Sequence, residues 1–187
     1  MKKVSFFLLG AAFLASSLAF VAPKNPKAPI TLAVQSDKSR VDFIGSKAAD
    51  FHTGTFAVKG GSVQVEGGKL VGGSFVIDLA NLKVTDAAGE RLAGHLKSAD
   101  FFDVAKFGEA VYTISSVDYS SATACKINGT LNIKGVGVPV SFDANIRSAS
   151  EKGLFGQAYF SLDRTLLGIA YAGPSKDVQI AVHLFAK

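Results

Sequence analysis

Apolar and polar residues alternate along most of the chain from residue 30 onward. Strict alternation is typical of β-strands, because successive side chains point to opposite faces and only one face is buried. The last such stretch has an apolar residue at every second position from Val178 to Leu184. The pattern predicts strands over Ile30–Val34, Val41–Phe43, His52–Glu66, Leu70–Leu79, Glu109–Tyr119, Cys125–Lys134, Val138–Arg147, Leu154–Leu162 and Val178–Phe185.

Short connections join most of these strands. Glu66-Gly67-Gly68-Lys69 is a strong hairpin signal, Gly135-Val136-Gly137 indicates a second tight turn, and Gly60-Gly61 is expected to break one long strand. Antiparallel strands in one domain form either a sandwich or a closed barrel, and short hairpins between sequential strands favour the barrel. We therefore predict one all-β domain over residues 30–187, built as an eight-stranded antiparallel barrel.

The interior of that barrel is open to two interpretations. Eight strands leave room either for packed side chains or for one elongated ligand. The inward positions carry Phe, Ile, Val and Leu diluted by Gly and Ala, and a packed core uses the same residue types. Composition alone therefore leaves both a filled barrel and a barrel with an apolar cavity open.

Ala87–Lys97 is the one segment that does not fit a strand. Leu92 and Leu96 are four apart among charged neighbours, which predicts a short amphipathic helix. Phe101 and Phe102 are adjacent in the connection that follows. Connections usually face solvent, so two large apolar side chains there are expected to be buried against another part of the protein. They either plug one end of the β-structure or cover the mouth of a cavity.

Two charged residues are candidates for contact with a ligand headgroup. His95 lies one turn before the phenylalanine pair, where it either caps the short helix or contacts a headgroup at the cavity mouth. Arg164 follows Asp163 and precedes an apolar turn. Either these two residues form an ion pair that pins a loop, or Arg164 meets an anionic or polar headgroup at the rim.

The chain carries no recognisable catalytic or metal-binding motif. His52, His95 and His183 are not at metal-ligand spacing, and neither a Gly-x-Ser-x-Gly nor a phosphate-binding loop is present. The enzyme hypothesis that stays open would use His95 with Asp100 or Asp103. The formal charge of +5 is scattered rather than clustered, which argues against nucleic acid. We predict no catalytic residues, no metal and a binding protein rather than an enzyme.

The N-terminus has the pattern of a secretory signal peptide. Lys2 and Lys3 precede the uncharged run Val4–Val21, in which small residues follow the apolar core. We predict a signal peptide over residues 1–19 and a proline- and lysine-rich linker over residues 20–29. The alternative is an uncleaved anchor, since the run nearly reaches spanning length. We expect an exported protein, periplasmic or secreted, and its single cysteine excludes an internal disulfide.

Three stretches of the sequence resemble the YceI-like family of exported bacterial proteins. They are His95–Phe107, the segment Asn128–Val140 with its Gly-Val-Gly-Val-Pro-Val ending, and Asp163-Arg164 followed by Gly168-Ile169. The resemblance extends from about residue 30 to the C-terminus. It implies an extended, lipocalin-like, eight-stranded antiparallel barrel with a short helical lid. It also implies a hydrophobic tunnel that holds a polyisoprenoid or another long-chain amphiphilic lipid.

With that resemblance, the leading hypothesis is an exported protein that sequesters or carries such a lipid. The alternative is a structural or stress-related barrel without ligand. A lipid-modifying enzyme is a weaker alternative. No cofactor is expected beyond a bound isoprenoid quinone or polyprenyl lipid, and a transient membrane contact and a homodimer are further expectations. His95, Phe101, Phe102 and Arg164 are predicted to form the lid and headgroup contacts. The predicted tunnel lining is Phe56, Phe75, Ile77, Tyr112, Ile114, Leu131, Ile133, Phe142, Phe160 and Ile180.

Overall fold

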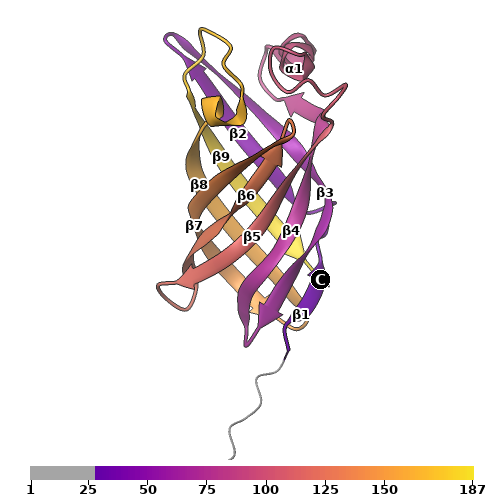
Figure 1. Cartoon of the computed structure of the whole chain (residues 1–187), viewed down its shortest axis with the longest axis vertical. Helices are drawn as coiled ribbons and strands as arrows, with labels where there is room; N and C mark the ends of the chain where they lie inside the picture. Colours follow the sequence, from indigo (N-terminus) through magenta and orange to yellow (C-terminus); the bar gives the residue numbers. More distant parts are fainter. Residues whose placement is uncertain (1–27) are drawn as a thin grey trace, which may run out of the picture.

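The computed structural model describes residues 28–187, and the predicted signal peptide lies outside them. In this part of the chain, eight antiparallel strands, β2 to β9, close into a barrel (Figure 1). This confirms the predicted barrel and excludes the sandwich. The elements are β1 (Ile30–Ala33), β2 (Arg40–Lys47), β3 (Asp50–Glu66), β4 (Lys69–Val84), α1 (Gly89–Lys97), β5 (Glu109–Tyr119), β6 (Ala124–Ile133), β7 (Val136–Ser150), β8 (Gly153–Asp163), η1 (Arg164–Leu167) and β9 (Asp177–Ala186).

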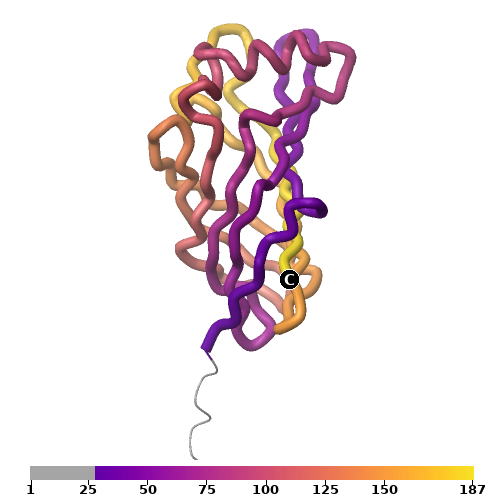
Figure 2. Tube along the Cα trace, turned by 90° about the vertical axis from the view of Figure 1, so that its right-hand side faces the viewer, coloured from indigo at the N-terminus to yellow at the C-terminus, as the bar shows by residue number. Residues whose placement is uncertain are grey.

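The barrel closes between β2 and β9, whose register runs from Arg40 opposite His183 to Gly45 opposite Val178. The short strand β1 lies along the other half of β3, where Ile30 pairs with Val65. Its continuation at Val34 bridges to the end of β9. β1 and β2 therefore act as one interrupted strand between β3 and β9, as the trace in Figure 2 shows.

The turns explain where the strands reverse and where they do not. Gly67 and Gly68 have φ of 56° and 78°, the left-handed backbone that a tight hairpin requires, and the predicted turn is confirmed. Gly60-Gly61 does not break β3, contrary to the prediction; the register shifts there as a bulge and the strand continues. The second predicted turn, Gly135-Val136-Gly137, is centred on Lys134 and Gly135, earlier than expected, and β7 already begins at Val136.

One end of the barrel is covered by the connection between β4 and β5 (Figure 1). The helix α1 within it begins at Gly89 and ends at Lys97, close to the predicted bounds, with Ala93 fully buried. The connection then continues through turns to Phe107. The loop between β8 and β9 reaches the same end. No helix within residues 28–187 has the length and apolar character needed to cross a membrane.

Candidate ligand-binding cavity

The barrel interior contains a cavity of about 210 Å³ beneath α1, so the filled-barrel alternative does not hold. Each of the strands β2 to β9 contributes to its wall. A water-sized group needs roughly 10–15 Å³ by this measure, so the cavity has room for on the order of fifteen such groups. Apart from Tyr112, whose hydroxyl is bonded to the wall, the polar and charged lining residues belong to the segments around the mouth: Ser46, Lys47, His52, Arg164 and Ser175.

The structure places most of the predicted tunnel residues around this cavity. Ile114 is the exception, because it lines a smaller cavity of about 30 Å³ farther down the barrel. The predicted residues that line the larger cavity are Phe56, Phe75, Ile77, Tyr112, Leu131, Ile133, Phe142, Phe160 and Ile180.

Several lining residues were not predicted, and Phe43 shows why. Its ring turns into the cavity at a point where the paired strand carries Gly54. A Cβ at Gly54 would lie 2.2 Å from Cζ of Phe43, so only glycine leaves room for the ring. The alternation around Val41 and Phe43 signalled an inward side chain, but the opposing glycine is visible only once the register is known. The other unpredicted apolar lining residues include Leu92, Leu96, Leu167 and Ile169.

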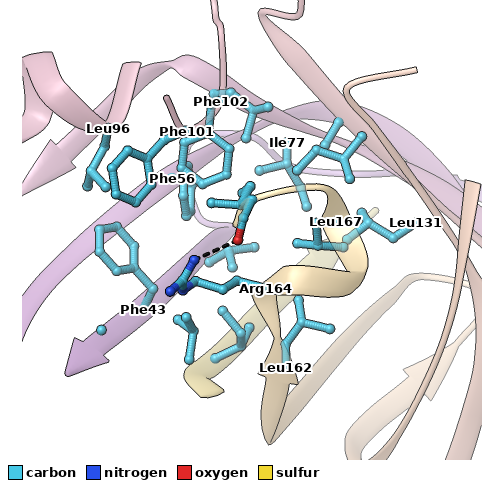
Figure 3. A pocket seen from close by; sticks show the side chains of 18 of the residues that line it. Phe43, Phe56, Ile77, Leu96, Phe101, Phe102, Leu131, Leu162, Arg164 and Leu167 are labelled. Atoms are coloured by element: carbon cyan, nitrogen blue, oxygen red, sulfur yellow. Dashed lines mark hydrogen bonds between the residues drawn. The ribbon is translucent and has the colours of Figure 1, made fainter. Parts of the chain in front are cut away.

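The roof of the cavity is formed by the phenylalanine pair and by the apolar edge of α1. Phe101 and Phe102, the residues predicted to form the lid, both line the cavity. The ring of Phe102 meets the ring of Phe56 edge to face, with centroids 5.6 Å apart. Figure 3 shows both rings beside Phe56 and Leu96 above the cavity. The backbone is held from below, because Lys134 Nζ donates to the carbonyl oxygen of Phe101 at 2.5 Å.

A cluster of three rings fastens this roof to the β8–β9 loop. The ring centroids of His95, Phe101 and Tyr171 lie 4.9 to 5.0 Å from one another. His95 Nε2 is also 3.5 Å from Oδ2 of Asp100. His95 does not line the cavity, so the structure places this predicted headgroup contact in the fastening of the lid.

Arg164 organises the β8–β9 loop from inside. Its guanidinium donates to four carbonyl oxygens: Ile169 at 2.6 Å, Tyr171 at 2.7 Å, Pro174 at 2.8 Å and Ser175 at 2.9 Å. The dashed line in Figure 3 marks one bond from Arg164. Its side chain therefore holds the loop against the cavity wall, and the residue is only 9 % exposed.

The predicted ion pair between Asp163 and Arg164 is not formed. Asp163 instead accepts hydrogen bonds from Thr165, one from the hydroxyl at 2.6 Å and one from the backbone N–H at 2.9 Å. These bonds, foremost the one from the hydroxyl, lower the pKa of the Asp163 carboxyl. Among residues 28–187, no carboxylate lies within 4.0 Å of Arg164, so its charge faces the cavity without a counter-ion from this part of the chain.

A carboxylate also ties the lid to the barrel rim on the other side of the mouth. Asp86 accepts backbone N–H bonds from Ala88 and Thr53, both at 2.8 Å, and lies 3.3 Å from Nδ1 of His52. The bond from Ala88 is the largest cause of a lowered pKa at Asp86, followed by the bond from Thr53. His52 lines the cavity mouth, a role that the sequence analysis did not assign to it.

The walls of the site offer an apolar binding surface. Across residues 28–187, no three His, Cys, Asp or Glu side chains come together as metal ligands would. Tyr112, the polar side chain of the larger cavity that lies away from its mouth, donates its hydroxyl to the carbonyl oxygen of Val140 at 2.9 Å. What the geometry can do is take an apolar molecule out of water and hold a polar end at the mouth.

Fold and site together define a lipocalin-like antiparallel barrel with an apolar cavity under a short helical lid. The sequence matches the family model of the YceI-like domain over residues 32–186. The chain therefore belongs to the YceI-like family, as the resemblance in its motifs predicted.

The curated relatives are members of the UPF0312 group. The chain is 28 % identical to a UPF0312 protein of Pseudomonas fluorescens (strain SBW25) over 127 residues, which is 65 % of this chain and 66 % of the relative. It is 29 % identical to UPF0312 protein PputW619_0484 of Pseudomonas putida (strain W619) over 117 residues, 62 % of this chain and 60 % of the relative. The chain thus spans about two thirds or less of the length of these relatives.

Two solved structures share the fold. BcnA of Burkholderia cenocepacia superimposes with a TM-score of 0.70 and 18 % identity, covering 82 % of this chain and 99 % of that one. A polyisoprenoid binding domain from Saccharophagus degradans, implicated in plant cell wall breakdown, gives a TM-score of 0.66 and 16 % identity, covering 83 % and 97 %. At such identities the likeness shows the barrel architecture.

Proposed function

We propose that this chain is an exported protein that sequesters or carries a polyisoprenoid or another long-chain amphiphilic lipid, and that it is a binding protein rather than an enzyme. The observation that carries the proposal is the shape of the cavity, with apolar walls and with charged and polar side chains gathered at the mouth. Membership of the YceI-like family and the fold shared with a polyisoprenoid binding domain support it.

The apolar walls supply the affinity for a tail. Each buried methylene contributes about 0.8 kcal/mol, less the cost of ordering the chain. Such a gain requires a cavity in which water finds few hydrogen-bond partners. Walls of Phe, Leu, Ile and Val offer water almost none.

The mouth suits a polar or anionic headgroup. A guanidinium has five N–H donors, and Arg164 directs four hydrogen bonds to carbonyl oxygens. That leaves one donor and an uncompensated positive charge for an oxygen of the ligand. Lys47 and His52 line the mouth from the neighbouring β2–β3 hairpin and add further donors. The headgroup contact we propose thus uses Arg164, Lys47 and His52, with His95 holding the lid.

Loading would take place at a membrane surface. Phe51 and Leu166 are 60 % and 59 % exposed, and each stands on a segment that borders the mouth. The two segments are joined, because the backbone N–H of Ser175 donates to the carbonyl oxygen of Ser46 at 2.7 Å.

Export through a signal peptide over residues 1–19 and a homodimer are further parts of the proposal. The mass of the mature chain tests the first, and light scattering tests the second.

Native mass spectrometry of the protein purified from its exported compartment, followed by denaturing extraction, tests the function. We expect one lipid per chain, released on unfolding. A bare mass that persists after incubation with isoprenoid quinones and fatty acids would contradict the proposal.

The double variant Phe101→Ala/Phe102→Ala should lose the lipid faster, because it removes the two rings that form the roof of the cavity. Phe155→Ala is the matched control, since that ring stacks on Phe185 and lines neither cavity.

A further inference from the structure

Four aromatic rings cross the barrel interior below the larger cavity. The centroids of Phe75 and Tyr112 are 5.7 Å apart, those of Tyr112 and Phe142 are 5.4 Å apart, and Phe142 and Phe160 stack at 4.4 Å. They come from β4, β5, β7 and β8. The strand between, β6, leaves space for them, since a Cβ at Gly129 would lie 2.6 Å from the Tyr112 hydroxyl. We call these four rings the aromatic septum.

The aromatic septum separates two cavities. The larger, of about 210 Å³, extends from it toward the lid, and the smaller, of about 30 Å³, lies on its other side. Phe75, Tyr112 and Phe142 line both cavities, as does Val182 from the facing strand β9. Beyond the septum the smaller cavity is lined by aliphatic residues and by Gln157. Among the aliphatic ones is Ile114, the predicted tunnel residue that the larger cavity does not reach.

The septum is held in place on several sides. Phe75, Tyr112 and Phe142 are all buried, and the hydroxyl of Tyr112 is bonded to the β7 backbone at Val140. Buried rings in contact with one another move only if their neighbours move, because protein interiors are densely packed. The septum is therefore a floor for the larger cavity rather than a flap.

We propose that the aromatic septum sets the length of the lipid chain that the barrel accepts, with Phe142 as the side chain that closes off the smaller cavity. This inference rests on the proposed function. Each methylene above the floor should raise affinity about 4-fold. Carbons beyond the length that reaches the floor stay at the mouth and add little. Affinity should therefore rise with chain length to a limit and then level off.

Competition read by native mass spectrometry tests this directly. The delipidated protein is incubated with an equimolar pool of saturated fatty acids of increasing length and, separately, of all-trans prenols. In the native chain we expect a length limit in each series. In Phe142→Ala the limit should move by about two carbons or more, because the smaller cavity holds roughly two water-sized groups and the lost ring adds space. A chain two carbons past the native limit should gain roughly 15-fold in relative occupancy.

Three further variants complete the design. Phe155→Ala removes the same ring from the outer face of β8 and should leave the limit unchanged. Phe142→Ala/Ala144→Leu refills the smaller cavity, which Ala144 lines, and should restore the native limit. Phe142→Leu replaces the alanine variant if that variant melts near the assay temperature.

The outcomes separate the inference from the function on which it rests. Equal limits in the native chain and in Phe142→Ala, or native affinity that keeps rising through the longest chains, would overturn the role of the septum while leaving lipid binding intact. Failure of the native chain to bind any length in either series would instead overturn the proposed function, and the inference with it.

Discussion

Replacing Tyr112 by phenylalanine should make the barrel less stable at neutral pH but more stable than the native chain in strong alkali. The hydroxyl is buried, with the side chain 3 % exposed, and it donates to the carbonyl oxygen of Val140 at 2.9 Å. Tyr112→Phe removes that bond and keeps the ring in the septum. The loss of one neutral hydrogen bond should lower the free energy of unfolding by about 1 kcal/mol.

The alkaline behaviour follows from the pKa of the phenol. Burial raises the pKa of Tyr112 from 10.0 to about 12. Between these values the unfolded chain releases the proton while the folded chain keeps it, so unfolding is increasingly favoured as the pH rises. The native chain should lose about 1.4 kcal/mol by pH 11 and roughly 2 kcal/mol by pH 12, whereas the variant has no phenol there to ionise. The two stability curves should therefore cross near pH 11.

Urea unfolding followed by far-UV circular dichroism, repeated from neutral pH to about pH 12, measures both effects. The difference in unfolding free energy between the two proteins is the quantity to compare. Burial also raises the pKa values of Tyr119 and Cys125, but both groups are present in both proteins and cancel in the difference. A difference that stays constant across the whole range would refute the reasoning.

Two other substitutions probe the framework around the cavity. Arg164→Lys replaces a fork that bonds four carbonyl oxygens with an ammonium that reaches fewer, so stability should fall by about 2–4 kcal/mol and Tm by roughly 10 °C. Hydrogen exchange should rise first in residues 165–176, and unchanged protection there would contradict the role of Arg164 in holding the loop. Gly129→Ala pushes a Cβ against Tyr112 and should cost about 1–3 kcal/mol in a thermal melt. Gly94→Ala is its control, because a Cβ on that helical glycine meets nothing within 4 Å, and the change should stabilise α1 by about 0.5–1 kcal/mol.

The side of the barrel wall on which a residue lies could be predicted from the sequence. Phe75, Ile77 and Tyr112 follow the period of two and face inward, because a wall one strand thick has only an inner and an outer face. The same period carries no information about height along the barrel axis. Ile114 is two residues from Tyr112 and shares its face, yet it lies beyond the aromatic septum. The depth of the cavity therefore emerged only from the structure.

The parts of the site built from loops were harder to predict. His95 meets Tyr171, a partner far away in the sequence, and no local pattern links the two. Arg164 donates four hydrogen bonds to backbone carbonyl oxygens, which every residue carries, so these partners leave no trace in the residue types around it. The phenylalanine pair was recognisable because two large apolar side chains in a connection must be buried against something, and here they roof a cavity.

The seam between β2 and β9 has a consequence for how the cavity comes into being. It pairs Arg40 with His183 and Phe43 with Ile180, residues separated by most of the domain. Loop closure over such a distance has a large entropic cost, so folding rates fall as contacts become less local. The hairpins from β3 to β9 are local and can form early, but they make only an open, curved sheet. The binding chamber should therefore appear in a single late event, and a lipid should be able to select only the finished barrel.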